Sequence, residues 1–397
     1  MRIGLAIEHF EPERGGAEIW TLQFVRQLLS RGHEVHVVSQ TFSREVSALP
    51  LVTHRLGRFV SRIRRAQAFE RRLRSLNLDV VHDMGAGWYC DVFHSHDGSR
   101  MAQWDRKLVG LSGIMRPWKR LLVRWSPRYA AFRKLMARQF HAPDRLFLAL
   151  SRMVADDYQR YHHVPEEQIR IIHNGVDVER FDPARSRLLR EPIRRQWGLG
   201  DDELVLLFVG HDFFRKGLAT AILALGRLAG DAPVRLVVVG GSRWRPYARL
   251  AEQCGVADRL TFVGAVGDPL PYYGAADVCV LPTLYDPCSL VVLEAAACGL
   301  PVVTTRQNGA GELLTDGCDG FVLPDPTDAD ALAGRIGLLL DGDCRRRMSA
   351  AARTLALQNT LSHNVDRFEA LYREVARSGR TPHAAAGSSP RTSRVAV

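Results

Sequence analysis

The stretch LVLLFVGHDFFRKG, residues 204–217, decides the fold. It begins with a short apolar run of the kind that forms a buried strand, and a polar turn with a basic end follows. A similar strand opens the chain at RIGLAI, residues 2–7, and a glycine-containing loop and a helical pattern follow it. Strands and helical patterns then alternate along most of the sequence. This alternation predicts an α/β protein whose parallel sheets are covered by helices on both faces.

The predicted strands form two groups, separated by a polar, Arg-rich stretch that contains Pro183 and Pro192. We therefore predict two doubly wound, Rossmann-like domains that face each other across a cleft, where the carboxyl ends of the strands place the ligand site. The expected parts are an N-terminal domain at 1–180, a C-terminal domain at 181–358, a helix at 359–377 that packs back on the N-terminal domain, and a disordered tail at 378–397.

The local patterns give approximate element bounds. Ile19, Leu22, Val25 and Leu29 lie on one face of a helix that ends at Gly32. The expected strands lie at 2–7, 35–39, 78–82, 91–94, 145–150 and 169–172 in the first group, and at 204–210, 234–239, 260–263, 278–281, 302–305 and 321–323 in the second.

Composition excludes several classes of protein. With 46% hydrophobic and 24% charged residues, the 397-residue chain is expected to be globular rather than disordered or fibrous. No apolar run approaches the ~20 residues of a membrane-spanning helix, and the N-terminus lacks the pattern of a signal peptide. Seven cysteines without CxxC spacing suggest neither a disulfide framework nor a zinc site, so a reducing cytoplasm is expected.

Two short motifs follow predicted first strands and indicate phosphate binding. Gly15 and Gly16 allow backbone amides to approach a ligand beside a helix N-terminus, although a simple tight turn explains them equally well. Arg215 and Lys216 offer a forked donor and a point charge that suit a diphosphate, with a solvated basic loop as the alternative. No GxGxxG follows the first strand of either domain, so binding of a nicotinamide dinucleotide is not supported.

The segment YDPCSLVVLEAAACGLP, residues 285–301, carries the most information about function. Pro287 and Ser289 mark a helix start, with Asp286 just before it and Glu294 one to two turns inside. Because a carboxylate in so apolar a run is costly to bury unpaired, Glu294 is expected to meet a partner or face the cleft, where paired sugar hydroxyls would satisfy it. The alternative is an acid that serves only the helix dipole.

In order, the GG loop, NGVD at 174–177, RKG at 215–217, the acid-x7-acid pair and GLPVV at 299–303 resemble the retaining glycosyltransferases of family four, which have the two-domain GT-B fold. Within that family the chain is most similar to the lipopolysaccharide inner-core glucosyltransferases, over most of residues 1–375. The resemblance implies an acceptor-side N-terminal domain and a C-terminal domain that binds a nucleotide sugar. It also implies that no metal or other cofactor is needed, since a diphosphate leaving group would meet fixed cations and a helix N-terminus.

The same resemblance implies roles for individual residues. Glu294 would hold the donor ribose, and Asp286, which replaces the usual Glu, would contact the donor hexose. Asp97, in DVFHSHDG at 91–98, would face the acceptor hydroxyl, and a carboxylate there can accept its proton. His94 and His96 flank this position and are expected to be structural, with His96 orienting Asp97 as the alternative. The assigned catalytic residues are Asp97, Arg215, Lys216 and Asp286, and the assigned donor-binding residues are Gly15, Gly16, Arg215, Lys216, Asp286, Ser289, Leu290 and Glu294.

The net charge of +11 is concentrated in the N-terminal half. Residues 100–145 contain twelve Lys or Arg against two Asp, and residues 55–74 contain eight Arg against one Glu. Aromatic residues recur at helical spacing in the first stretch, which is typical of helices that lie on anionic membranes and resembles the membrane-associating region of the core glucosyltransferases. The alternative is a core-packing helix pair with a solvated basic face. The candidate residues for binding a membrane or an acidic acceptor are Arg116, Trp118, Lys119, Arg120, Trp125, Arg128, Arg133 and Lys134.

These observations favour a retaining glycosyltransferase that moves a hexose, glucose from UDP-glucose, to a lipopolysaccharide-core or other glycolipid acceptor. It is expected in the cytoplasm, peripheral on the inner face of the plasma membrane. A mannosyl- or other hexosyltransferase that acts on a different glycolipid or polysaccharide is the alternative within this fold. A non-catalytic nucleic-acid-binding protein is the alternative from another class, but it leaves Lys216 and Glu294 unexplained, so no nucleic-acid partner is expected.

Overall fold

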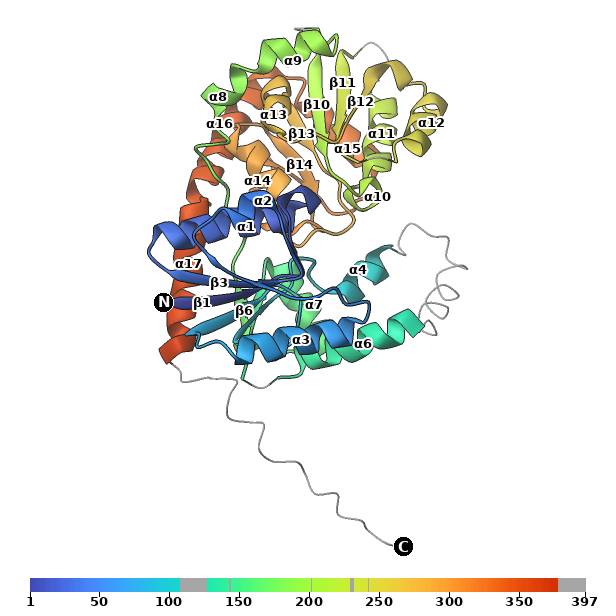
Figure 1. The fold of residues 1–397 in the computed structure, drawn as a ribbon. Helices are drawn as coiled ribbons and strands as arrows, with labels where there is room; N and C mark the ends of the chain where they lie inside the picture. Colours follow the sequence, from blue (N-terminus) through green and yellow to red (C-terminus); the bar gives the residue numbers. More distant parts are fainter. Residues whose placement is uncertain (108–126, 143, 201, 229–231, 242, 378–397) are drawn as a thin grey trace, which may run out of the picture.

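The computed structural model describes residues 1–107, 127–142, 144–200, 202–228, 232–241 and 243–377. These residues form two α/β domains, each with a parallel sheet between layers of helices (Figure 1). The expected fold class, with two Rossmann-like domains, is therefore confirmed.

The sheet of the N-terminal domain has the strand order β5-β3-β1-β6-β7-β8-β9, and its strands are parallel. Its inner strand β1, between β3 and β6, is buried on both faces, which explains its apolar sequence. The strands are β1 (Arg2–Ala6), β3 (Glu34–Ser39), β5 (Val52–Arg55), β6 (Val80–Asp83), β7 (Val92–His94), β8 (Leu146–Ala149) and β9 (Ile169–Ile171), and a separate pair is formed by β2 (His9–Phe10) and β4 (Thr41–Phe42).

The sheet of the C-terminal domain has the order β12-β11-β10-β13-β14-β15 and is also parallel. Residues 204–209 form its inner strand β10, as the opening motif predicts, and β11 and β13 flank it. The strands are β10 (Leu204–Val209), β11 (Val234–Val239), β12 (Leu260–Gly264), β13 (Val278–Val280), β14 (Val302–Thr305) and β15 (Gly320–Leu323).

Helices fill the connections between these strands. In the N-terminal domain they are α1 (Gly16–Ser30), α2 (Arg44–Ser47), α3 (Arg62–Arg74), α4 (Arg100–Lys107), α6 (Pro127–Phe140) and α7 (Arg152–His162). The helices that follow are α8 (Pro183–Arg187), α9 (Arg190–Gln196), α10 (Phe213–Lys216), α11 (Leu218–Arg227), α12 (Arg245–Gln253), α13 (Leu270–Ala275), α14 (Leu290–Ala297), α15 (Ala329–Leu338), α16 (Gly342–Gln358) and α17 (Leu361–Arg377).

Helix α17 returns to the N-terminal domain and lies along it (Figure 1). Arg31, at the end of α1, donates a hydrogen bond of 2.6 Å to Asp366 of α17. Deeper in the interface, the Tyr372 hydroxyl lies 2.7 Å from Nδ1 of the buried His82. Helix α17 is therefore part of the first domain's core.

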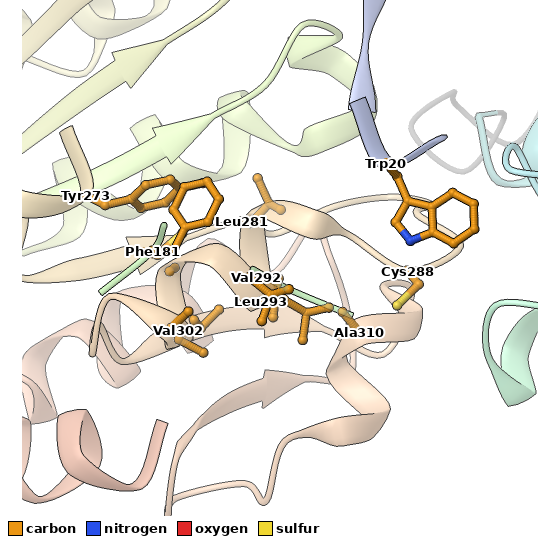
Figure 2. Close-up of a cluster of buried hydrophobic side chains, with 14 of the residues drawn as sticks. Trp20, Phe181, Tyr273, Leu281, Cys288, Val292, Leu293, Val302 and Ala310 are labelled. Atoms are coloured by element: carbon orange, nitrogen blue, oxygen red, sulfur yellow. The ribbon is translucent and has the colours of Figure 1, made fainter. Parts of the chain in front are cut away.

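The core of the C-terminal domain surrounds α14. Figure 2 shows Val292 and Leu293 of this helix among Leu281, Val302 and Ala310, and both side chains are fully buried. Burial of such a side chain stabilises the fold by about 1.5–3 kcal/mol. The helix that begins beside Asp286 and Ser289 is thus fixed by its apolar faces.

Two expectations change with the structure. The edge strand β5 was not predicted, because only His54 of its four residues is buried and the sequence lacks an apolar run.

The apolar stripe of α6 faces the protein core and not a membrane. Phe132, Leu135, Met136 and Phe140 are all buried in the core of the N-terminal domain. The alternative of a core-packing helix with a basic face therefore holds for α6. The expected tail at 378–397 lies outside the described residues.

Candidate active site

A cavity of about 820 Å³ lies between the two domains. It opens at the carboxyl ends of strands from both sheets, and its size falls in the range of small-molecule sites. The residues assigned from the sequence to catalysis and donor binding all line it: Gly15, Gly16 and Asp97 from the N-terminal domain, and Arg215, Lys216, Asp286, Ser289, Leu290 and Glu294 from the C-terminal domain.

Lys216 reaches the cavity from the short helix α10. Asp212 caps this helix by accepting a hydrogen bond of 3.1 Å from the Arg215 N–H. Gly217 ends it in the left-handed region at φ +80°, where a Cβ would lie only 1.9 Å from the Pro282 carbonyl oxygen. The RKG motif therefore requires glycine at its third position.

The ammonium group of Lys216 is buried and pairs with the Asp286 carboxylate. It also lies 3.4 Å from the Ser289 hydroxyl. Burial alone would raise the pKa of Asp286, but the positive charges of Lys216 and Arg215 outweigh it and hold this pKa below its usual value. A cation and an anion are thus held side by side in a buried wall of the cavity.

The backbone around Asp286 is fixed by the loop after β14. The Asp286 N–H donates to the Gln307 carbonyl at 2.9 Å, and the Gly309 N–H donates to the Asp286 carbonyl at 2.8 Å. The buried Asn308 side chain accepts from the Ser289 N–H at 3.2 Å, so it holds the start of α14. Asn308 was not identified from the sequence, because nothing in a lone Asn after a strand indicates this contact.

Ser289 is the N-cap residue of α14, as predicted, but its side chain does not cap the helix within the described residues. Its hydroxyl faces Lys216 instead. The positive end of the α14 dipole and Lys216 therefore meet beside Ser289, which favours a negatively charged ligand group there.

Glu294 lies further along α14 and accepts a hydrogen bond of 2.7 Å from the Tyr273 hydroxyl of α13. Burial raises the pKa of Glu294, and the Tyr273 hydrogen bond only partly offsets this. A tyrosine of the same domain is therefore one hydrogen-bond partner of this carboxylate, for which the sequence predicted a partner or a place at the cleft. The carboxylate still lines the cavity and has capacity for further donors.

The GG loop meets α14 across the cavity. An added Cβ at Gly16 would lie 3.6 Å from the Leu290 side chain, which is ordinary van der Waals contact. The first turn of α1 and the first turn of α14 therefore approach each other. Two helix N-termini face the same space, one from each domain.

Asp97 is half-exposed and accepts a hydrogen bond of 2.6 Å from Arg100. Behind it, His94 is buried, with its Nδ1 3.2 Å from His82 Nε2, and its ring is 4.1 Å from that of His96. Burial lowers the pKa of His96 to about 4, so its ring is neutral at pH 7. Its Nε2 has no hydrogen-bond partner among the described residues. Packing in the core, rather than charge, accounts for these two histidines.

Three contacts that join the domains, two of them at the 285–288 loop, were missed by sequence reasoning. The buried Tyr285 hydroxyl accepts from the Ser99 N–H at 3.0 Å, which places the Asp97 and Asp286 loops side by side. Asn174, in the NGVD motif, donates to the Cys288 carbonyl at 2.7 Å. Glu312 accepts from the Met153 N–H at the start of α7 at 2.8 Å. These contacts hold the two domains together beside the cavity.

The predicted basic surface is only partly described. Arg133 and Lys134 lie exposed on α6. Arg128 belongs to α6, but its side chain is outside the described part of the structure, as are Arg116, Trp118, Lys119, Arg120 and Trp125.

No helix in the described ranges combines the length and apolarity needed to cross a bilayer. The described residues also contain no group of three or more His, Cys, Asp or Glu arranged to hold a metal ion.

Comparison with known proteins gives the family. The profile of Glycosyltransferase Family 4 matches residues 14–180, and that of Glycosyl transferases group 1 matches residues 190–355. A D-inositol 3-phosphate glycosyltransferase from Xylanimonas cellulosilytica is 32% identical, with 86% of this chain and 87% of the relative covered. The chain belongs to the group 1 glycosyltransferases.

Further relatives of this glycosyltransferase share its fold. The lipopolysaccharide glucosyltransferase WaaG of Escherichia coli is 26% identical, with 80% of this chain and 84% of WaaG covered. A crystal structure of WaaG, a glycosyltransferase involved in lipopolysaccharide biosynthesis, matches with a TM-score of 0.77 at 23% identity, over 93% of this chain and 99% of that one. HepE of Anabaena in complex with UDP-glucose matches with a TM-score of 0.72 at 17% identity, over 95% and 100%.

Proposed function

We propose that this glycosyltransferase moves a hexose, glucose from UDP-glucose, to a lipopolysaccharide-core or other glycolipid acceptor with retention of configuration. The observation that carries the proposal is the cavity between the domains, in which Lys216, Asp286 and Glu294 share space with Asp97. The glucosyl donor and the lipopolysaccharide acceptor are supported by the similarity to WaaG, and UDP-glucose by the fold relative HepE.

In this proposal the C-terminal wall binds the donor. Arg215, Lys216 and the N-terminus of α14 face the diphosphate, so the charge that develops on the leaving group meets groups that are already in place. Glu294 accepts from the ribose hydroxyls. Asp286 accepts from the hexose, and its carboxylate sits one methylene further back than the Glu of the family motif.

Asp97 serves the acceptor in the same scheme. Its carboxylate is half-exposed at the cavity, so it can accept the proton of the attacking hydroxyl as the new glycosidic bond forms. We propose that no metal ion takes part, because Lys216 and Arg215 supply the positive charge. EDTA should therefore leave the rate unchanged, and an activity that collapses with EDTA and returns with manganese would contradict this.

A nucleotide-sugar screen tests the donor. UDP-glucose at 100 times its Kd should stabilise the protein by about 2.7 kcal/mol, which is measured as a rise in Tm. Transfer to a lipopolysaccharide core is then followed by mass spectrometry, and the anomeric configuration of the product by NMR. Stabilisation by GDP-mannose alone would replace the glucosyl assignment with the mannosyl alternative, and an inverted product would refute retention.

A second candidate acceptor is a small phosphorylated cyclitol. The relative at 32% identity is a D-inositol 3-phosphate glycosyltransferase, and its match covers more of this chain than the match to WaaG does. Competition between inositol 3-phosphate and a lipopolysaccharide core in one reaction mixture separates the two candidates, because the preferred acceptor accumulates product first.

We also propose that the protein works in the cytoplasm, bound to the inner face of the plasma membrane. Arg133 and Lys134 are exposed on α6, whose apolar side is buried, so this surface can attract anionic lipid by charge without inserting. Binding to vesicles with phosphatidylserine should exceed binding to phosphatidylcholine vesicles and weaken with salt. Equal binding to both, or none to either, would contradict the proposal.

A further inference from the structure

Three arginines of the N-terminal domain also line the cavity and have no role in the scheme above. Arg62 and Arg65 lie one turn apart at the start of α3, and Arg100 begins α4. The guanidinium carbon of Arg62 lies 4.9 Å from the centre of the Phe132 ring, and that of Arg100 lies 5.5 Å from the same centre. Two cations therefore share one aromatic ring at the wall of the cavity.

Arg65 lies in the same part of the wall and is unusual in its burial. Only 7% of the residue is exposed, and its guanidinium group pairs with Glu8. Its Nε–H is buried without a hydrogen-bond partner within the described parts of the chain. A buried donor of this kind costs free energy until a ligand or neighbour accepts from it.

Electrostatics around Arg65 favour an anion. Burial lowers its pKa, and the positive charges of Arg62 and Arg100 lower it further, while Glu8 and Asp83 oppose them. The buried Asp83 carboxylate accepts from backbone N–H groups of the following turn, at 2.6 Å and 2.7 Å. The clustered cations thus repel one another, and a negatively charged ligand would relieve this repulsion.

Glu8 pairs with Arg65 and Asp97 pairs with Arg100, and both carboxylates are partly exposed. The Glu8 side chain is 41% exposed and that of Asp97 is 51% exposed. The exposed Arg100–Asp97 pair contributes about 0–1 kcal/mol, so a stronger acceptor can displace it, and the Nε–H of Arg65, unpartnered among the described residues, can donate to the same acceptor. A phosphate group offers three oxygens to forked guanidinium donors and forms the stronger, charge-assisted bonds.

We propose that Arg62, Arg65 and Arg100 form a subsite for a phosphate group carried by the acceptor. This inference rests on the proposed function, because it defines the acceptor as a phosphorylated sugar, cyclitol or glycolipid. The subsite also explains the Arg100–Asp97 pair: a phosphate that takes Arg100 leaves the Asp97 carboxylate to the acceptor hydroxyl.

Binding of inorganic phosphate tests the subsite without any turnover. The double variant Arg215→Gln/Lys216→Gln removes the donor-side cations, and calorimetric titration should still detect phosphate. Adding Arg65→Gln should weaken this binding at least tenfold, and adding Arg100→Gln should do the same without lowering Tm. The matched control Arg64→Gln, an exposed arginine of the same helix, should leave the phosphate affinity unchanged.

Two results would overturn the subsite. One is that the double variant binds no phosphate. The other is that the phosphate affinity of the double variant is unchanged when Arg65→Gln or Arg100→Gln is added. Because Arg65 is buried, its replacement can unfold the domain, whereas Arg100 lies at the surface. The Arg100 variant therefore gives an answer even if the Arg65 variant does not fold.

Acceptor pairs then identify the source of the phosphate. Hexose and cyclitol monophosphates are compared with their unphosphorylated parents, and a phosphorylated lipopolysaccharide core with the same core after removal of phosphate. In one of these arms the phosphorylated member should have at least a tenfold higher kcat/KM, and Arg100→Gln should abolish the difference.

Equal rates within every pair would overturn the subsite and leave the proposed function intact. Phosphate binding that depends on Arg65 and Arg100, in a protein that glycosylates no acceptor, would support the subsite while the proposed function fails.

Discussion

The two walls of the cavity hold their polar side chains in different ways. On the C-terminal wall, Lys216, Asp286 and Asn308 are buried and tied to one another or to the backbone. On the N-terminal wall Arg65 is also buried, but Asp97 and Arg100 are about half-exposed and pair mainly with each other. A pre-organised wall suits the part of a substrate where charge develops, and an exposed one can adapt to varied acceptors.

The largest effect is expected from a substitution in the C-terminal wall. Lys216→Ala removes the buried cation that faces the proposed diphosphate and leaves Asp286 buried without its ion-pair partner. We expect kcat/KM to fall about 100-fold, equivalent to about 2.7 kcal/mol of transition-state stabilisation. Steady-state kinetics with saturating acceptor measures it.

Arg306→Ala is the control for that prediction, because Arg306 is an exposed cation of the same domain that does not line the cavity. Its kinetics should stay within twofold of the wild type. A wild-type rate in Lys216→Ala would remove this residue from the mechanism and with it the proposed use of the C-terminal wall.

Acid should weaken the N-terminal domain first, since its buried histidines are neutral. Burial lowers the pKa of His82 to about 3 and those of His96 and His162 to about 4. The unfolded chain takes up these protons below pH 6.5 and the folded domain does not, so the free energy of unfolding falls as pH drops from 6.5 towards 4.

Two buried carboxyls oppose this trend. Burial raises the pKa values of Asp83 and Asp91 to about 6, so between pH 6 and 4 the folded state takes up protons there and gains stability on acidification. The histidines outweigh them, and we expect a net loss of about 3 kcal/mol between pH 7 and pH 5. Urea unfolding at both pH values measures it.

His162→Phe should flatten that pH dependence, because the ring already stacks on Phe140 at 3.7 Å and a phenyl ring can keep the contact. His363→Gln, a change at an exposed histidine of α17, is the control, and its free energies of unfolding are measured at the same two pH values. The same dependence of the unfolding free energy on pH in His162→Phe and in the wild type would show that His162 is not held neutral.

A smaller effect is expected at Glu294, which accepts a hydrogen bond from Tyr273 but, unlike Asp286, is not paired with Lys216. Glu294→Gln should lower kcat/KM about tenfold, equivalent to about 1.4 kcal/mol, mainly through the KM for the donor. Because burial raises the pKa of Glu294 and so disfavours the charged form, the variant should unfold at the same or a higher temperature than the wild type.

Tyr273→Phe separates the proposed donor-binding role of Glu294 from its structural role as the hydrogen-bond partner of Tyr273. It removes the 2.7 Å hydrogen bond but keeps the ring, so we expect a loss of about threefold in kcat/KM. A Glu294→Gln variant that loses stability and keeps its donor KM would mean that the carboxylate is a structural residue.

The sequence predicted the fold and the C-terminal wall well because their signals are local. Buried parallel strands are apolar without interruption, and Lys216, Asp286, Ser289 and Glu294 stand within two short motifs at strand ends. Each residue could be singled out from its neighbours in the chain, while the role expected of it came from the family resemblance. Gly217 follows the same logic, because the end of α10 requires its left-handed backbone.

The residues that join the walls could not be predicted, because their partners are distant in sequence. Ser99 and Tyr285 are 186 residues apart in the sequence, and Asn174 and Cys288 are 114 residues apart. The stripe at Phe132, Leu135 and Met136 has the same spacing whether it faces lipid or core, and only the adjacent sheet and α3 show that it is buried.

A last substitution tests how the walls are held together. Gly98 follows Asp97 and lies in the left-handed region at φ +66°, where a Cβ would be 2.3 Å from the Tyr285 hydroxyl. Gly98→Ala should therefore push the Asp97 loop away from Tyr285 and its neighbour Asp286. We expect kcat to fall about fivefold, equivalent to about 1 kcal/mol, with the KM for the donor nearly unchanged.

Strain of the backbone alone must be separated from this displacement. Gly32→Ala is the matched control, since Gly32 has φ +80° and an added Cβ there would meet no atom of the described structure within 4 Å. It should cost stability but not activity. In Gly98→Ala, Tyr285→Phe should restore part of kcat, because it removes the oxygen that the new methyl group meets. A double variant no faster than Gly98→Ala would show that the Tyr285 contact does not set the distance between the walls.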